Sequence, residues 1–486
     1  MRPRIPEKAH PKEELLKTLR AYREGDAKFR DGRTWSLVYF AGDEFNDTLK
    51  QAHNLFFSEN ALNPMAFKSL KRMEHEVVAM SASMLHAPEQ ACGTMTTGGT
   101  ESILMAVKAY RDRAKKRHPE IVAPETAHVA FEKAAHYFGV KLRKAPIGRD
   151  FRADVAEMRR LVNRNTVALV GSAPQYPQGV VDPIEEIAAL AREKKLPLHV
   201  DACIGGFVLP WVERLGHDVP PWDFRVPGVT SISADLHKYG YAAKGASVVV
   251  YRDMSYLKHQ FFVSTDWSGG IYASPTMPGT RSGGSIAAAW AAMHAMGEAG
   301  YLAHTERAMQ ATKNLRAGID AVSGVEVLGS PHCTLFSYGA NADDVSLYAV
   351  GDQLEDRGWS IDRQQHPASI HCTVTSNHLP IVDEYVRDLA QAVAYVRQHP
   401  EVKSRGNAAM YGMMAKIPMR GMVKQGVLKV MEQMYGPEGA DDLSGVGKGK
   451  NDGPLLRAMN KYGDKALAAL DTLDALKQRL TRKSKR

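Results

Sequence analysis

The sequence contains few cysteines, and they are not arranged as a crosslinked framework or a metal site. Cys92, Cys203, Cys333 and Cys372 are scattered, and no two of them form a C-x-x-C pair. Such thiols are typical of a reducing compartment, and no ligand pairs occur at zinc spacing. We therefore expect free thiols and no metal ion, with the His-Cys pairs at 332–333 and 371–372 serving as packing residues.

Long apolar runs are also absent. No run approaches the roughly 18 apolar residues that a membrane-spanning helix needs. The first residues, MRPRIPEKAHPKEELLKTLR, lack the apolar centre of a secretory signal. These absences predict a soluble protein located in the cytoplasm.

Acidic residues are missing from the last ten positions, KQRLTRKSKR, which hold six of the basic residues behind the net charge of +9. We favour a solvated terminus, and the alternative is peripheral contact with a membrane or another phosphorylated surface. The body shows no basic stripe with interleaved aromatics, so nucleic-acid binding is not expected.

The pattern from about residue 65 to 250 alternates between helix and strand. Residues 101–116 and 154–162 have helical apolar spacing. Apolar, β-branched runs that predict strands occupy residues 166–172, 196–202, 229–233 and 246–251. This alternation predicts an α/β fold with a mostly parallel sheet, whose ligands gather at the carboxyl ends of the strands.

The pattern changes near residue 300, where long helices and short strands predict a smaller α+β domain. We therefore expect four parts: an N-terminal docking segment (1–50), a large domain (51–295), a small C-terminal domain (296–435), and a linker with the basic tail (436–486).

The stretch TTGGTES (96–102) stands immediately before the first predicted helix. Its glycines allow backbone N–H groups to turn toward an anion, and the helix N-terminus adds partial positive charge. It lacks the lysine of a Walker A loop and the G-x-G-x-x-G spacing, so ATP and NAD are weak candidates. A phosphate cup and a simple helix cap are about equally compatible with this stretch alone.

Two further stretches place charge at the ends of predicted strands. In HVDACIGG (199–206), Asp201 ends an apolar strand, where a carboxylate either needs a positive partner or caps the next turn. In SISADLHKYGY (231–241), Lys238 either forms a Schiff base or makes an ion pair, for which Asp235 is the nearest candidate.

His128, in ETAHVAFEKAAHYFG (125–139), is placed to stack on a planar ring, although a lone histidine is usually structural. The order along the chain is more specific than any one stretch. A phosphate cup, a stacking histidine, a strand-end aspartate and a lysine are together what pyridoxal 5′-phosphate requires.

These stretches also carry a resemblance that runs from about residue 36 to 425. TTGGTESILMAVKAYRDRA, PLHVDACIGGF, VTSISADLHKYGYAAKGAS and TMPGTRSGG resemble the sphingosine-1-phosphate lyase family of group II PLP-dependent decarboxylases. The resemblance implies fold type I, with a mostly parallel seven-stranded sheet in the large domain and a soluble, bacterial-type enzyme.

The resemblance assigns cofactor roles to residues of this chain. Lys238 matches the Schiff-base lysine and His237 its neighbour, while His128 matches the ring-stacking histidine and Asp201 the pyridinium partner. The remaining cofactor matches are Gly98, Gly99 and Thr100 in the phosphate loop, and Thr280, which a homodimer partner lends to that loop.

Other matches concern the substrate. Lys244, Tyr39 and Tyr176 match groups near the reacting centre, of which Lys244 and Tyr39 adjoin the substrate phosphate. Asn63 stands where the family often has a phosphate-binding histidine, and an amide cannot carry that charge. Tyr411 and Arg420 match a stretch that closes over the site.

The resemblance implies an aldehyde-lyase that cleaves the C2–C3 bond of sphingosine 1-phosphate and leaves the identity of the general base open. Two alternatives remain: an amino-acid decarboxylase with the same cofactor residues, and a catalytically silent scaffold that binds phospholipid.

Overall fold

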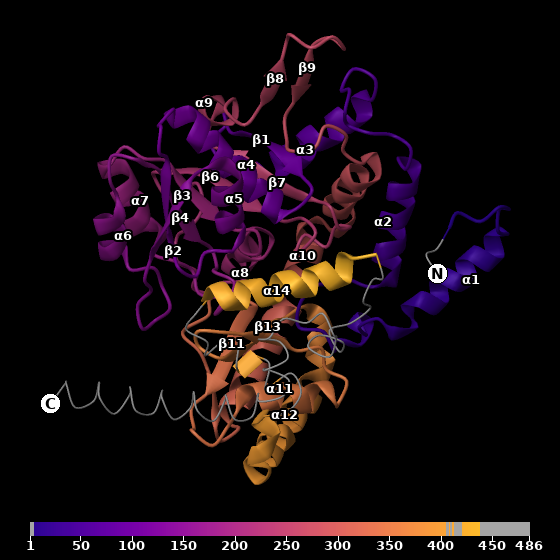
Figure 1. Cartoon of the computed structure of the whole chain (residues 1–486), viewed down its shortest axis with the longest axis vertical. Helices are drawn as coiled ribbons and strands as arrows, with labels where there is room; N and C mark the ends of the chain where they lie inside the picture. Colours follow the sequence, from indigo (N-terminus) through magenta and orange to yellow (C-terminus); the bar gives the residue numbers. More distant parts are fainter. Residues whose placement is uncertain (1–3, 405–407, 409–410, 413–419, 438–486) are drawn as a thin grey trace.

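The computed structural model describes residues 4–404, 408, 411–412 and 420–437 (Figure 1). The basic tail predicted from the sequence lies outside these ranges. No helix within them is both long and apolar enough to span a membrane. All four cysteines are free thiols, and three of them are buried.

A seven-stranded sheet in the order β1-β7-β6-β5-β4-β2-β3 forms the centre of the larger half. Its strands are β1 (Cys92–Thr96), β2 (Glu120–Pro124), β3 (Lys141–Ala145), β4 (Thr166–Ser172), β5 (Leu198–Asp201), β6 (Val229–Ala234) and β7 (Ser247–Tyr251). The five strands from β6 to β3 are parallel, whereas β7 is antiparallel to both of its neighbours. The predicted mostly parallel sheet is confirmed, and β4 to β7 correspond to the four predicted strands.

Helices cover both faces of this sheet because its central strands are apolar on both sides. Val248 and Val250 of β7 pack into one core with α3 (Lys68–Met84) and α7 (Ile184–Glu193). Val249 and Tyr251 pack into a second core with α4 (Gly99–Ala114) and α5 (Ala130–Phe138). The remaining short helices of this half are α6 (Val155–Leu161), α8 (Leu209–Arg214) and α9 (Met254–Leu257).

The smaller half contains a four-stranded antiparallel sheet in the order β10-β11-β13-β12. Its elements are β10 (Val325–Val327), β11 (Leu335–Ala340), α11 (Leu347–Glu355), β12 (Asp362–Gln364), β13 (Ser369–Thr373), α12 (Val382–Gln398) and α14 (Arg420–Tyr435). Helix α10 (Gly283–Asp320) connects the halves and breaks its helical geometry at Gly297, which has φ 57°. The domain boundary predicted after residue 295 falls within α10, close to this break.

The N-terminal segment reaches the smaller half before it enters the larger one. Helix α1 (Lys12–Tyr22) has no buried residue, and Leu15, Leu19 and Tyr22 are exposed on it. Trp35 is fully buried and stacks on Trp359 of the smaller half, with ring centroids 6.1 Å apart. Helix α2 (Asp43–Leu55) then packs along α10.

A hairpin of β8 (Phe262–Ser264) and β9 (Tyr272–Ser274) projects beyond the sheet at the top of Figure 1. Phe262, Val263, Trp267 and Ile271 are exposed on it. Contiguous apolar surface of this kind is typical of a protein–protein contact.

Candidate active site

A cavity of about 290 Å³ gathers most of the predicted site residues between the two halves of the chain. The predicted residues that line it are Tyr39, His128, Tyr176, Asp201, His237, Lys238 and Lys244. They come from the N-terminal segment, from the end of β5, and from the loops that follow β2, β4 and β6. The carboxyl ends of parallel strands therefore carry the site, as the sequence predicts.

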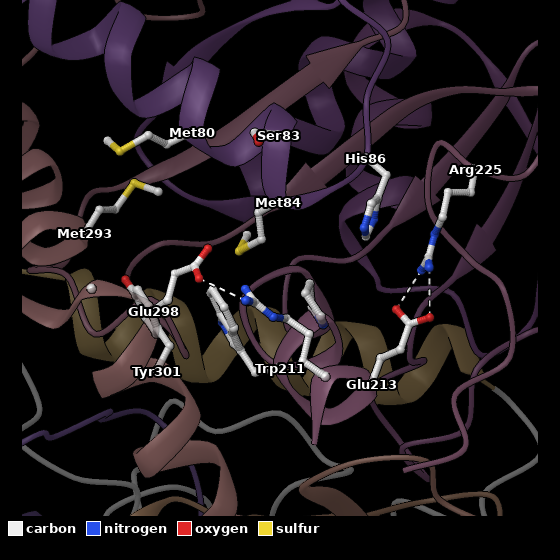
Figure 2. Close-up of a pocket in the computed structure, with 13 residues that line it drawn as sticks. Met80, Ser83, Met84, His86, Trp211, Glu213, Arg225, Met293, Glu298 and Tyr301 are labelled. Carbon is white, nitrogen blue, oxygen red and sulfur yellow. Dashed lines mark hydrogen bonds and ion pairs between the residues drawn. The ribbon is translucent and has the colours of Figure 1, made fainter. Parts of the chain in front are cut away.

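A larger cavity of about 640 Å³, shown in Figure 2, lies between α3, α8 and α10. None of the predicted site residues lines it. Its charged side chains pair with one another, Arg225 with Glu213 at 2.7 Å and Arg214 with Glu298 at 2.9 Å. Size alone therefore does not identify the site of chemistry in this chain.

The predicted phosphate loop joins the end of β1 to the start of α4. Helix α4 begins at Gly99, two residues before the predicted start, so Gly99 and Thr100 lie in its first turn. A Cβ on Gly99 would lie 2.6 Å from Cys203 Sγ and 2.7 Å from Asp235 Oδ2. Only glycine allows the loop to come this close to residues that border the cavity.

Asp201 is the last residue of β5, and only 7 % of it is exposed. Its Oδ1 accepts hydrogen bonds from the Cys203 backbone N–H at 3.1 Å and from the Ser233 hydroxyl at 3.3 Å. These bonds fix a carboxylate in the wall of the cavity. Burial lowers the pKa of the neighbouring His199 to about 4, although the Asp201 charge opposes this effect.

Lys238 forms an ion pair with Asp235, which the sequence offered as the alternative to a Schiff base. Its Nζ lies 2.8 Å from Asp235 Oδ2, and the Asp235 side chain is 1 % exposed. Burial disfavours the charged form of both side chains, but the attraction between the two opposite charges is stronger than this effect. The pKa of Asp235 is therefore lowered and that of Lys238 is raised. Asp235 Oδ1 has no hydrogen-bond partner among the described residues.

Lys244 provides a second positive charge in the same cavity. Its Nζ donates to the His237 carbonyl at 3.1 Å and lies 5.3 Å from the centre of the Tyr39 ring. Desolvation by the cavity walls and the charge of Lys238 lower the pKa of Lys244 to about 8. Burial raises the pKa of Tyr39 to about 12, despite the opposing charge of Lys238.

Tyr176 meets a carboxylate that the sequence did not reveal. Its hydroxyl donates to Asp362 of β12, and its ring stacks on His371 of β13 with centroids 4.2 Å apart. Asp362 and Thr373 line the cavity beside Tyr176. Asp362 stands in a three-residue strand far along the chain, and no local pattern distinguishes it from a surface aspartate.

Several predicted residues lie outside the cavity. Thr280 and Asn63 are exposed, and the Asn63 side chain caps its own loop by accepting from the Met65 N–H at 2.9 Å. Tyr411 packs beside Tyr348, and Arg420 contacts His366. A substrate or cofactor contact by these residues therefore stays a prediction, and Thr280 is predicted to act on the partner subunit.

The site fits pyridoxal 5′-phosphate by its shape and its chemistry. The glycine loop at the N-terminus of α4 suits a phosphate group, because free N–H groups and the helix dipole both favour an anion. Asp201 supplies a buried carboxylate for a protonated ring nitrogen, and Lys238 supplies an amine for an aldehyde. His128 lines the same cavity.

Comparison with known proteins gives a family match and relatives that align over most of this chain. The family described as "Pyridoxal-dependent decarboxylase conserved domain" matches residues 45–340. The sphingosine-1-phosphate lyase of Arabidopsis thaliana is 44 % identical over 434 residues, which are 87 % of this chain and 79 % of that protein. Sphingosine-1-phosphate lyase 1 of Rattus norvegicus is 42 % identical over 87 % of this chain and 75 % of its own length.

Solved structures agree with the sequence matches. The sphingosine-1-phosphate lyase of Burkholderia pseudomallei is 40 % identical and superposes with a TM-score of 0.79, over 88 % of this chain and 96 % of that one. Glutamate decarboxylase of Lactobacillus brevis, 24 % identical, superposes with a TM-score of 0.72 over 82 % of this chain and 96 % of its own. At that identity the second likeness concerns the fold alone.

Proposed function

The chain belongs to the pyridoxal-dependent decarboxylase family and, within it, to the sphingosine-1-phosphate lyases, and from this membership we propose that it cleaves the C2–C3 bond of sphingosine 1-phosphate and related phosphorylated sphingoid bases. The products are phosphoethanolamine and a long-chain aldehyde. The observation that carries the proposal is the cavity in which Lys238, Lys244, Tyr39 and Tyr176 converge.

Pyridoxal 5′-phosphate is the cofactor of this family, and its ring withdraws the electron pair of the bond that breaks. In this chain, Gly98, Gly99 and Thr100 would hold the phosphate at the N-terminus of α4. Asp201 would keep the ring nitrogen protonated through its charge, and His128 would flank the ring. Lys238 would bind the aldehyde, with His237 beside it.

The substrate phosphate needs a positive charge that is not already paired with a carboxylate. Lys238 is paired with Asp235, whereas the Nζ of Lys244 donates to a neutral backbone carbonyl. Lys244 therefore binds the phosphate, with the Tyr39 hydroxyl as a second donor. A cation and a phenol in one cavity orient a phosphorylated amine more specifically than a charge alone.

Proton transfer accompanies the bond cleavage. The C3 hydroxyl loses its proton as its C–O bond becomes a carbonyl, and C2 gains a proton before phosphoethanolamine leaves. Lys238, Lys244, Tyr39 and Tyr176 all line the cavity and carry transferable protons. Lys238, which would bind the cofactor aldehyde, is the group that we assign to proton transfer at C2.

The active enzyme is a homodimer in this proposal, with Thr280 supplied to the phosphate loop of the other subunit. Two features support it: the exposed apolar side chains of the β8–β9 hairpin, and the exposure of Thr280 six residues after β9. Burying that hairpin against a second copy would remove its exposed apolar residues from water.

Product analysis tests the proposed reaction. Purified protein loaded with pyridoxal 5′-phosphate is incubated with sphingosine 1-phosphate, and phosphoethanolamine and long-chain aldehyde are quantified by mass spectrometry. We expect equal amounts of both, none from Lys238→Ala, and little turnover of unphosphorylated sphingosine. Release of carbon dioxide from amino acids, without aldehyde from sphingosine 1-phosphate, would instead identify a decarboxylase.

A further inference from the structure

The hydroxyl of Tyr176 is held by a carboxylate from the other half of the molecule. Tyr176 lies in the loop after β4, whereas Asp362 lies on β12 of the small sheet. The hydroxyl donates to Asp362 Oδ2, and both side chains line the cavity that holds Lys238.

The surrounding bonds fix both partners. Asp362 stands opposite His371 in the β12–β13 register, and the His371 ring stacks on Tyr176 at 4.2 Å. His371 Nε2 lies 2.8 Å from the Thr373 hydroxyl, which faces the same cavity. The Tyr176 loop is closed by the bond from the Gly179 N–H to the Gln175 carbonyl at 3.1 Å. Tyr176 is therefore oriented before any substrate arrives.

Burial, reinforced by the charge and the hydrogen bond of Asp362, raises the pKa of Tyr176. Its phenol consequently keeps its proton throughout the range in which enzymes work. A neutral phenol is a poor proton acceptor unless its own proton can move on at the same time. Asp362 is the group that can take it.

Resting on the lyase reaction proposed above, we propose that Tyr176 accepts the proton of the substrate C3 hydroxyl, and that Asp362 is the positioning residue that takes the Tyr176 proton in the same step. Among the cavity groups, Lys244 is committed to the phosphate. No hydrogen bond joins Tyr39 to a carboxylate in the described structure. Lys238 is paired with Asp235, but in the reaction proposed above it serves the cofactor aldehyde and C2. Tyr176, which faces the cavity with Asp362 behind it, is therefore assigned to the C3 hydroxyl.

The step balances without an outside reagent. The C3 O–H proton moves to the Tyr176 oxygen while the Tyr176 proton moves to Asp362. The C3–O bond becomes a carbonyl, the C2–C3 bond breaks, and its electron pair remains with the C2 fragment. The proton that Tyr176 gained from C3 then passes through Lys238 to C2, the proton on Asp362 returns to Tyr176, and the product leaves, so the cycle consumes no proton overall.

A double-mutant cycle tests the coupling of the two residues. Tyr176→Phe and Asp362→Asn should each lower kcat by about 10²–10⁴-fold, with KM changed by less than about threefold, because proton transfer rather than binding is lost. The double variant should be no slower than the slower single variant. Asp362→Glu, which restores a carboxylate, should recover part of the rate.

The matched control is Asp344→Asn in the same half, which removes an exposed carboxylate paired with Arg397. The proposal would be overturned by a kcat of Asp362→Asn within twofold of the wild type. It would also be overturned if the decrease in kcat of the double variant equalled the product of the two single decreases. Equal near-ultraviolet circular dichroism and an unchanged cofactor absorption band in every variant separate lost chemistry from misfolding.

A readout without turnover separates this inference from the proposed reaction. In protein labelled with ¹³C at tyrosine Cζ, the Tyr176 resonance is assigned by its disappearance in Tyr176→Phe. This resonance should shift in Asp362→Asn and remain unchanged in Asp344→Asn. An unchanged resonance in Asp362→Asn would contradict the hydrogen bond between Tyr176 and Asp362. If wild-type protein does not cleave sphingosine 1-phosphate, the proposed function is wrong. The proposed proton transfer through Tyr176 to Asp362 is then wrong as well, even if the resonance shifts.

Discussion

The ammonium of Lys238 lies 2.8 Å from Oδ2 of Asp235, a carboxylate that is itself 2.7 Å from the position a Cβ on Gly99 would occupy. The lysine proposed to bind the cofactor aldehyde, its counter-ion and the predicted phosphate loop therefore meet at one buried point. Any change in the charge or volume of one of them is expected to alter cofactor binding through the other two.

The first prediction concerns Asp235. The Asp235 charge, working against burial, raises the pKa of Lys238, so at neutral pH the lysine is an ammonium and cannot attack an aldehyde. In Asp235→Asn the main charge that opposes burial is lost, and we expect burial to lower the pKa of Lys238. Covalent attachment of pyridoxal 5′-phosphate to cofactor-free protein at pH 7, followed by absorbance, should be at least about tenfold faster. Attachment at the wild-type rate would contradict this prediction.

The second prediction concerns the pH dependence of substrate binding. Lys244 has its pKa lowered from the usual 10.5 to about 8, so it is charged below pH 8 and loses its charge above it. The substrate phosphate, whose second pKa is about 6, keeps its charge throughout this range. KM for sphingosine 1-phosphate should therefore rise as pH rises through about 8, approaching tenfold per pH unit. Lys244→Arg stays charged and should show no such rise before pH 10.

The third prediction concerns the close approach of the phosphate loop. In Gly99→Ala the new methyl group meets Cys203 Sγ at 2.6 Å and the Asp235 carboxylate at 2.7 Å, which forces the loop away from the cavity. Overpacking of this kind costs about 1–3 kcal/mol in the free energy of unfolding. Cofactor affinity, measured by fluorescence titration, should fall at least about tenfold, since the loop's N–H groups move away from the phosphate. Gly25→Ala, where nothing lies within 4 Å, should leave both quantities unchanged.

The fourth prediction concerns the stretch that carries Thr280. Its neighbour Arg281 is buried and pairs with Glu74 of α3 at 2.5 Å, while also donating to the Met95 carbonyl at 3.4 Å. Glu74→Gln leaves a buried guanidinium without its counter-charge, which costs about 3–5 kcal/mol in the free energy of unfolding by urea. Exposed Glu298→Gln, which breaks the ion pair with Arg214, should cost less than about 1 kcal/mol.

Elements with a strong local pattern were predictable. Strand β4 reads TVALVGS, with an apolar centre, and is buried along all seven residues, and the prediction of residues 166–172 matches it. Helix α6 matches the prediction of 154–162 because Asp154 caps it by accepting from the Glu157 N–H at 3.0 Å. Strands with a weak pattern were missed: β1 reads CGTMT, and the edge strand β3 reads KLRKA with two exposed lysines.

The site residues at the ends of the parallel strands were also predictable from the sequence. The contact made where the two halves of the chain pack together was not. His128, Asp201 and Lys238 lie at or after the carboxyl ends of the parallel strands β2, β5 and β6, so their convergence follows from the parallel sheet. Asp362 reaches Tyr176 across 186 positions of sequence, through a short strand of the second sheet. The His371–Cys372 pair, expected to serve only in packing, is buried but also stacks on Tyr176.

The covalent role of Lys238 is the claim on which the rest depends. Protein loaded with pyridoxal 5′-phosphate is reduced with borohydride, digested, and mapped by mass spectrometry. We expect the reduced cofactor on the peptide that contains Lys238 and on no other, with the label lost in Lys238→Ala. Stoichiometric label on Lys244 or any other lysine of the loaded wild-type protein would contradict the account.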